Sequence, residues 1–374
     1  MKIYADNAAT TKLDAEAFEA MKPWLLDEYA NASQSYSFSR KPKVALNQAR
    51  ELIAACINAE SQEIFFTSGG TESDNWAIKS SALANLNERP NIITSAIEHK
   101  AVLNSCAAMK NLGCSVTILP VDNFGTVNPA DLQEKIFLQT KIISVMLANN
   151  EVGTIQPIKT LADIAHASGK IFHTDAVQAV GHIPVDVKLL GADMLSASAH
   201  KFNGPKGIGF LYVRDGLKLL PYIDGGGQEF SRRAGTENIA SIVGMAVALK
   251  KNIDALDKNR EHVKNLEQLF MRELERNHIP HTRNGSEHSL PGLISLSFDG
   301  LDGEAIFHRL DLMGISISTG SACDSKKIQV SHVLKALHLS ESRAKGTIRI
   351  SLGKDNTSED VHAIVAALKK CFRD

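Results

Sequence analysis

Short, strongly apolar runs alternate with helix-like segments through the middle of the chain, from about Glu63 to Val213. The runs read EIFFTS, NIITSA, VTILPV, KIISVMLA, KIFHTDA, DMLSASA and IGFLYV, and between several of them lie segments such as KAVLNSCAAMKNLG and IKTLADIAHASGK, which end near a glycine. A strand that is apolar along its whole length is typical of a sheet buried on both faces, and strands that alternate with helices pair in parallel. The pattern predicts an α/β fold with a mostly parallel, seven-stranded sheet covered by helices.

The pattern changes after GGGQEFSRRAGTEN. A long amphipathic helix is predicted from about Ile239 to His278. It is followed by a strand (LISLSF), a helix (GEAIFHRLDLMG), a strand (ISIST), a helix (SHVLKALHL), a strand (TIRISL) and a last helix from Ser358. We therefore predict a large domain at residues 16–250 and a smaller α+β domain at residues 1–15 and 251–374. A cleft between two domains is the usual place for a functional site.

Composition excludes several classes of function. The 374-residue chain has a formal net charge of -1 and no block of like charges, so neither nucleic acid nor an anionic membrane is expected as a general partner. No segment approaches the roughly 20 apolar residues of a membrane span, and the first residues, MKIYADNAATTK, do not resemble a signal peptide. The cysteines are irregularly spaced, at Cys56, Cys106, Cys114, Cys323 and Cys371. Their odd number and the lack of a CxxC pair argue against a disulfide framework and a metal site, and favour a reducing cytoplasm.

Ligands collect at the carboxyl ends of the strands in open parallel sheets, so the residues after each apolar run are the candidates for a site. In FFTSGGTESDN, two glycines and several hydroxyl side chains follow a strand where a helix should begin. Free N–H groups and the positive helix end predict an anion site there, with Thr71 as an additional donor. The alternative interpretation is a plain turn in which Thr71 or Ser73 caps the helix.

Two further strand ends carry reactive side chains. Asp175 ends the run KIFHTD, with Gln178 three residues later, and SASAHKFNGPKG places Ser198, His200 and Lys201 in a tight turn. A buried carboxylate needs a partner, and a lysine becomes nucleophilic when burial or neighbouring charge lowers its pKa. Taken singly, Asp175 is equally well a helix cap, and the His-Lys pair equally well a surface loop.

Together these three strand ends match one cofactor. Pyridoxal 5'-phosphate (PLP) needs a lysine for its aldehyde, a carboxylate for its ring nitrogen and an anion cradle for its phosphate. The chain offers them in the order phosphate turn, acid and lysine, which predicts a PLP enzyme.

Over nearly its whole length the sequence also resembles the cysteine desulfurases, the NifS/IscS-like branch of the class V aminotransferases, which have the PLP-dependent fold type I. The resemblance is carried by YADNAATT, FTSGGTES, ANNEVGTIQP, TDAVQAVG, HKFNGPKGIGFLYVR, GGGQEFSRRAGTEN, TGSAC and TIRISLG. It implies conversion of L-cysteine to L-alanine, with transfer of the sulfur to an enzyme cysteine as a persulfide. It also implies delivery of that sulfur to an acceptor protein, either an iron–sulfur scaffold or a tRNA-thiolating enzyme.

The resemblance also implies a role for each matching residue. Lys201 would form the Schiff base with PLP, Asp175 would pair with the ring nitrogen, Gln178 would donate to the ring oxygen, and His99 would stack on the ring and act as acid and base. The phosphate would be held by Gly70, Thr71, Ser198 and His200, and by Thr236 from the neighbouring subunit of a homodimer with shared active sites. Asn150 and Arg349 would hold the substrate, although without the family Arg349 reads as a charge on an edge strand.

Cys323, in ISTGSACDSKK, would be the nucleophile that takes the sulfur. It lies among small and polar residues, as expected for a loop that carries sulfur from a buried cofactor to a surface acceptor, and TGSAC matches the longer loop type of the family. The other interpretation is a free cysteine in a linker.

Two competing functions remain at this stage. A selenocysteine lyase or another class V enzyme would keep Lys201 and Asp175 but would not need Cys323. A non-enzymatic interaction protein would be expected to have lost one of the three. The family motif near the site entrance is altered here to NASQSYSFS, at residues 31–39, which leaves substrate gating open.

Overall fold

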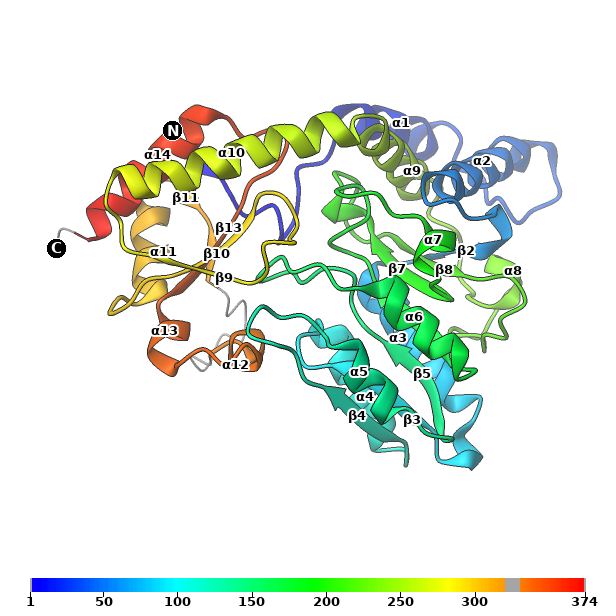
Figure 1. Cartoon of the computed structure of the whole chain (residues 1–374). Helices are drawn as coiled ribbons and strands as arrows, with labels where there is room; N and C mark the ends of the chain where they lie inside the picture. Colours follow the sequence, from blue (N-terminus) through cyan, green and yellow to red (C-terminus); the bar gives the residue numbers. More distant parts are fainter. Residues whose placement is uncertain (1, 320–329, 373–374) are drawn as a thin grey trace.

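The computed structural model describes residues 2–319 and 330–372. Figure 1 shows two packed parts, a larger one built around a long sheet and a smaller one around a short sheet, with the helices α9 (Ile239–Asp254) and α10 (Leu256–Arg276) passing from one to the other.

The large sheet has seven strands in the order β2-β8-β7-β6-β5-β3-β4. Their bounds are β2 (Ile64–Thr67), β3 (Asn91–Ser95), β4 (Ser115–Leu119), β5 (Thr140–Ser144), β6 (Ile171–Asp175), β7 (Met194–Ser198) and β8 (Gly209–Val213). Only β8 runs antiparallel to its neighbours, and the remaining pairs are parallel. All seven apolar runs of the sequence form these strands, so the prediction of a mostly parallel sheet is confirmed.

Alternate residues of each strand enter different cores on the two faces of this sheet. Ile64 and Phe66 belong to one apolar cluster with helices α2, α6 and α9, whereas Phe65 packs with Trp76 of α3 and Val102 of α4. Because both faces are covered, strands without polar alternation are the stable choice. The helices of this part are α1 (Ala15–Leu26), α2 (Arg40–Cys56), α3 (Gly70–Leu83), α4 (Lys100–Lys110), α5 (Pro129–Lys135), α6 (Ile158–Ala167), α7 (Val187–Leu190) and α8 (Gln228–Ser231).

The smaller part surrounds a four-stranded antiparallel sheet of order β12-β13-β10-β9. Its strands are β9 (Thr282–Asn284), β10 (Leu293–Ser297), β12 (Ser318–Thr319) and β13 (Thr347–Ser351), with α11 (Gly303–Leu312), α12 (His332–Ala336), α13 (Glu341–Lys345) and α14 (Ser358–Cys371). A short pair, β1 (Ile3–Tyr4) and β11 (Ile315–Ser316), brings the N-terminus to this part.

Two details of the expected second half are wrong. The single helix from Ile239 to His278 is two helices, because Ala255 leaves the helical region of backbone space (φ -103°, ψ 12°). The break lets α9 pack on the large core while α10 packs on the small one. The run ISIST is likewise divided, since Ile315 pairs with β1 and Ser318 pairs with β13.

The N-terminal residues bridge the two parts. Ile3 and Ala5 belong to the core of the small part, and Ala8 to the core of the large part. The domain limits proposed from the sequence stay a prediction. Among the described residues, no helix combines the length and apolar character needed to cross a membrane.

Candidate functional site

A cavity of about 620 Å³ lies at the carboxyl end of the parallel strands and collects most of the predicted residues. Its lining comprises Ala8, Ala9, Thr10, Ser68, Gly69, Gly70, Thr71, Glu72, Asp74, His99, Met146, Asn150, Asp175, Val177, Gln178, Ser198, His200, Lys201, Lys206, Gly207 and Arg349. Strand ends of the large sheet, the start of α3, the N-terminal segment and β13 of the small sheet therefore meet at one place.

Lys201 lies directly after β7, in a short 3-10 turn (Ala199–Lys201). Its Nζ donates hydrogen bonds to the carbonyl oxygens of Ala8 (2.6 Å) and Ala9 (2.9 Å). Burial, assisted by the charge of Arg349, lowers the pKa of the amine to about 8. An amine that loses its proton near neutral pH is available as a nucleophile.

Asp175 ends β6 and is buried. One carboxylate oxygen accepts the N–H of Val177 at 2.9 Å. Burial raises the pKa of this carboxyl group, whereas the neighbouring His99 and Lys201 act in the opposite direction. A buried carboxylate beside an open cavity requires a cationic partner.

The turn before α3 is built to receive an anion. Gly69, the N-cap, has φ 148°, which favours glycine, and its helix start has no side-chain cap. The alternative of a helix capped by Thr71 or Ser73 is therefore wrong. A Cβ on Gly70 would lie 2.5 Å from Cγ2 of Val177, so the backbone of the helix start approaches the β6 turn too closely for a side chain.

His200 and Ser198 flank this turn. Nδ1 of His200 lies 3.1 Å from Oγ1 of Thr10, and burial together with the charge of Lys201 lowers the pKa of its ring to about 4. The neutral ring therefore acts as a hydrogen-bonding group. Ser198 is buried, and its Oγ lies 3.4 Å from the position that a Cβ on Gly69 would take.

His99 and Gln178 approach the cavity from two other elements. His99 caps α4, and its Nδ1 accepts the N–H of Ala101 at 3.1 Å, which leaves the proton of a neutral ring on Nε2. The amide nitrogen of Gln178 donates to the carbonyl oxygen of Ala8 at 2.9 Å. Both side chains line the cavity, as predicted.

Arg349 is not on an edge strand, because β13 lies between β12 and β10. Its side chain is buried, with Nη1 donating to the carbonyl oxygen of Asn150 (2.8 Å) and Nη2 to Oδ1 of Asp6 (2.7 Å). Nε is also buried and has no hydrogen-bond partner among the described residues. A planar guanidinium with an unused donor suits a carboxylate ligand.

Two predicted residues are not placed in this cavity. Thr236 is exposed, in the loop before α9, and does not line the cavity. Cys323 lies outside the described residues.

Four acidic residues of the site were not predicted. Asp6 pairs with Arg349, and Glu151 accepts a hydrogen bond from Ser331 at 2.5 Å. Asp74 and Glu98 are buried, and Asp74 lines the cavity. Asp6 and Glu151 lie within motifs quoted for the family resemblance, Glu98 directly precedes His99, and Asp74 directly follows the motif FTSGGTES. That position is the signal that could have identified them.

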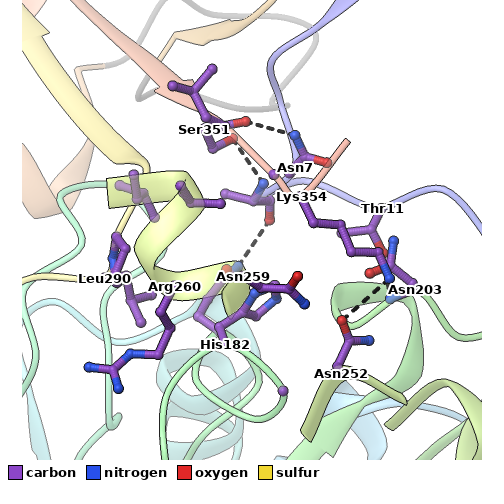
Figure 2. A pocket seen from close by; sticks show the side chains of 18 of the residues that line it. Asn7, Thr11, His182, Asn203, Asn252, Asn259, Arg260, Leu290, Ser351 and Lys354 are labelled. Carbon is purple, nitrogen blue, oxygen red and sulfur yellow. Dashed lines mark hydrogen bonds between the residues drawn. The ribbon is translucent and has the colours of Figure 1, made fainter. Parts of the chain in front are cut away.

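A second, narrower cavity of about 70 Å³ lies on the other side of Ala8 and Gln178. Figure 2 shows the side chain of Asn7 bonded to Ser351 at its rim, and Lys354 reaching toward Asn252. The bond of Asn7 fixes the N-terminal segment to β13, and the bond of Lys354 joins the segment after β13 to α9.

The residues of the large cavity fit PLP. The buried carboxyl group of Asp175, a glycine turn that a Cβ on Gly70 would obstruct, and the amine of Lys201 with its lowered pKa match the ring nitrogen, the phosphate and the aldehyde of this cofactor. No group of three or more metal-ligating side chains occurs in the described part of the chain.

Comparisons with known proteins agree with this arrangement. Residues 3–364 match the family described as aminotransferase class-V. The cysteine desulfurase IscS of Dictyoglomus turgidum is 48% identical over 370 residues, which cover 99% of this chain and 94% of that protein. Among solved structures, a NifS-like protein has a TM-score of 0.94 at 36% identity and covers 100% of this chain and 99% of its own. SspA in complex with cysteine has a TM-score of 0.85 at 38% identity, with 96% of this chain and 100% of its own covered.

Proposed function

The chain belongs to the class V aminotransferase family and to its cysteine desulfurases, and on this basis we propose that it converts L-cysteine to L-alanine and carries the sulfur as a persulfide on Cys323. The observation that carries the proposal is the meeting of Lys201, Asp175 and Arg349 in one cavity. Each of the three is charged or reactive, and each comes from a different strand end or strand.

PLP is the proposed cofactor. Lys201 would hold its aldehyde carbon, Asp175 its ring nitrogen and Gln178 its ring oxygen. The turn at Gly70 and Thr71, together with Ser198 and His200, would hold its phosphate. Bound PLP supplies an electron sink for the negative charge that develops at the substrate Cα.

Arg349 and Asn150 are proposed to bind the substrate. The fixed guanidinium would bind the carboxylate of L-cysteine, which leaves the amino group and the thiol directed toward the interior of the cavity. His99 would hold and release a proton at Nε2, because its Nδ1 is already engaged by the backbone of α4.

Cys323 is proposed to attack the sulfur of the bound substrate. The S–S bond forms as the Cβ–S bond of the substrate breaks, and the electron pair of that bond stays with the three-carbon product, which takes up a proton and leaves as alanine. The described residues on both sides of Cys323 support this role. Ser318 pairs with Arg349, and on the far side Ser331 bonds to Glu151 and His332 to the carbonyl oxygen of Glu98.

The proposed assembly is a homodimer in which Thr236 serves the site of the partner subunit. The exposed position of Thr236, away from the cavity of its own chain, agrees with this role. The persulfide would then pass to an iron–sulfur scaffold or a tRNA-thiolating enzyme. Free thiols at Cys56, Cys106 and Cys114 agree with a reducing cytoplasm as the place of action.

The test is alanine formation from L-cysteine and from L-selenocysteine, by the wild type and by Lys201→Ala and Cys323→Ser. Wild-type protein should form alanine from both substrates. Cys323→Ser should bind PLP and L-cysteine but release no sulfide under reducing conditions. Lys201→Ala should form no covalent PLP adduct.

Three results would contradict the proposal. Wild-type protein that stays colourless with excess PLP would exclude the cofactor. Normal turnover of L-cysteine by Cys323→Ser would exclude the persulfide. Turnover of selenocysteine alone would instead indicate a selenocysteine lyase.

A further inference from the structure

The cofactor cavity and its surroundings contain more buried acidic side chains than the proposed chemistry requires. Asp74 on α3, Glu98 before α4 and Asp175 on β6 are at most 5% exposed, and the ring of His173 on β6 is fully buried beside them. Oδ1 of Asp74 and Oε2 of Glu98 have no hydrogen-bond partner among the described residues. Asp74 and Asp175 both line the cavity.

A chain of hydrogen bonds ends at Asp74. Oγ of Ser144 lies 2.8 Å from Nδ1 of His173, Nε2 of His173 lies 3.0 Å from Oγ of Ser196, and Ser196 bonds to Asp74. Burial lowers the pKa of His173 to about 3, so its ring is neutral. Its contact with Oδ1 of Asp74 at 3.7 Å is therefore not an ion pair, and His173 cannot compensate a negative charge on Asp74.

Two neighbouring carboxyl groups in a buried site do not ionise together, because the first charge opposes the second. His99 and Lys201 favour the ionised form of Asp175, whereas Asp175 and Glu98 oppose the ionised form of Asp74. We propose that Asp74 is a positioning residue: it is the protonated member of an acid pair with Asp175, and it leaves a single negative charge on Asp175 for the ring nitrogen of the cofactor.

This inference rests on the proposed binding of PLP and deepens it. A protonated Asp74 can accept from Ser196 through its carbonyl oxygen. Because it is neutral, it does not compete with Asp175 for the ring nitrogen.

Burial and the two acids that face Asp74 raise its pKa, and the hydrogen bond from Ser196 opposes them. Asp175 and His173 face it from β6, Glu98 from the loop before α4, and Ser196 from β7. Cys106 of α4 is neutral at physiological pH, because burial raises the pKa of its thiol to about 12.

The first experiment compares the stability of cofactor-free wild type with that of Asp74→Asn. The amide copies the shape and donor pattern of a protonated carboxyl group but cannot ionise. Burial and the neighbouring acids raise the pKa of Asp74 above its value in the unfolded chain. The folded state therefore holds a proton that the unfolded chain releases, and wild-type stability falls as the pH rises from about 4. Asp74→Asn should melt about 2 °C or more above wild type at pH 8, and equal it near pH 4.

Asp193 provides the matched control. It is equally buried, but it pairs with Arg214 (2.8 Å) and bonds to the N–H of Phe172 (2.7 Å). Asp193→Asn should therefore lower the melting temperature at pH 8. If Asp74→Asn lowers it as well, at pH 8 and at pH 4, Asp74 is an ordinary structural acid and the proposal is wrong.

The second experiment measures the dissociation constant of PLP between pH 5 and pH 9, by cofactor absorbance. For a protonated Asp74, the variant should bind PLP within about twofold of wild type at pH 8. Its low-pH loss of binding should occur at the same pH as in wild type, because an amide and a protonated carboxyl group both present no charge to Asp175. A tenfold or greater loss of affinity at pH 8 would show that Asp74 carries a charge, against the proposal. If neither protein binds PLP, the proposed function fails, while the melting temperatures still decide the state of Asp74.

Discussion

At the scale of one residue, the position of Lys201 after a buried strand determines both the contacts that hold its side chain and the pKa of its amine. The amine of Lys201 donates hydrogen bonds to two carbonyl oxygens of the N-terminal segment. The backbone carbonyl oxygen of Lys201 lies 2.7 Å from Nε2 of His182. Both ends of the residue are thus held before any cofactor arrives. The surroundings that hold it also remove it from water, and this burial is the main reason for its lowered pKa.

The pH dependence of PLP attachment should follow this amine. With the pKa of Lys201 lowered to about 8, the neutral nucleophile forms as the pH rises through about 8. The attachment rate of cofactor-free protein, followed by absorbance at constant PLP concentration, should increase up to about pH 8.5 and then level off. An ordinary lysine would still gain rate at pH 10.

Peptide mapping after borohydride reduction provides the control. It should place the cofactor on Lys201 and give no labelled peptide for Lys201→Ala. A rate that keeps rising to pH 10 would contradict the environment described for this amine.

The sequence was sufficient to predict the site residues that directly follow an apolar run. Lys201, Asp175 and Gly70 follow apolar runs, and topology alone brings such ends together. Asp74 and Glu98 were not predicted, because an acid near a helix start is typical of a solvated capping position. Their burial depends on how α3 and α4 pack over the sheet. Arg349 was misread as an edge charge without the family, since strand order in the small sheet is a long-range property.

At the scale of elements, the start of α3 is the feature that makes the phosphate turn. Gly69 and Gly70 bring the backbone against Val177 and Ser198, so that the first N–H groups of the helix face the cavity region without a side-chain cap. The positive end of a helix dipole adds to the attraction for an anion.

Replacing Gly70 by alanine should weaken PLP binding. The new Cβ would lie 2.5 Å from Cγ2 of Val177, so either the helix start or the β6 turn must move. Overpacking of this kind costs about 1–3 kcal/mol, and a shift in the turn should reduce PLP affinity by roughly tenfold or more. Equilibrium titration of the cofactor-free protein measures the effect.

Leu83→Ala, at the exposed far end of the same helix, is the control and should bind PLP as wild type does. Unchanged affinity in Gly70→Ala would exclude this turn as the phosphate site. Inorganic phosphate should compete with PLP in wild type and less effectively in Gly70→Ala.

Helices and strands could be predicted where the apolar pattern was long. Where tertiary contacts decide the bounds of an element, the sequence was less informative. The seven runs of the large sheet each became a strand because burial on both faces leaves no other arrangement. The break at Ala255 was not visible, since the apolar stripe continues through it and only the change of packing partner bends the helix. Strands of two or three residues, such as β1 and β9, carry too little pattern to be predicted from sequence.

At the scale of the whole molecule, the site depends on segments far apart in the chain. Asp6 binds Arg349, the carbonyl oxygen of Ala8 accepts from Lys201 and Gln178, and Oγ1 of Thr11 donates to the carbonyl oxygen of His200. These contacts connect the first residues to both cores. The cavity therefore forms only when the two parts are docked, and PLP binding should stabilise the molecule as a unit.

The proposed sharing of active sites between two subunits can be tested with a heterodimer in which each subunit carries a different inactivating substitution. Thr236 lies away from the cavity of its own chain, so its proposed contact with phosphate must occur in a second copy. Lys201→Ala and Thr236→Trp should each be inactive or strongly impaired alone. A heterodimer of the two has one site with both defects and one site with neither, because the lysine and the threonine of a site come from different chains.

Co-expression of the two variants with different affinity tags, followed by purification through both tags, should therefore recover about half of the wild-type alanine-forming activity per heterodimer. If the two residues acted within one chain, each site would keep one defect and no activity would return. A monomer at micromolar concentration, measured by sedimentation, would also contradict sharing. The control pair, Lys201→Ala with Asp175→Ala, places both defects in residues of the same cavity and should recover none.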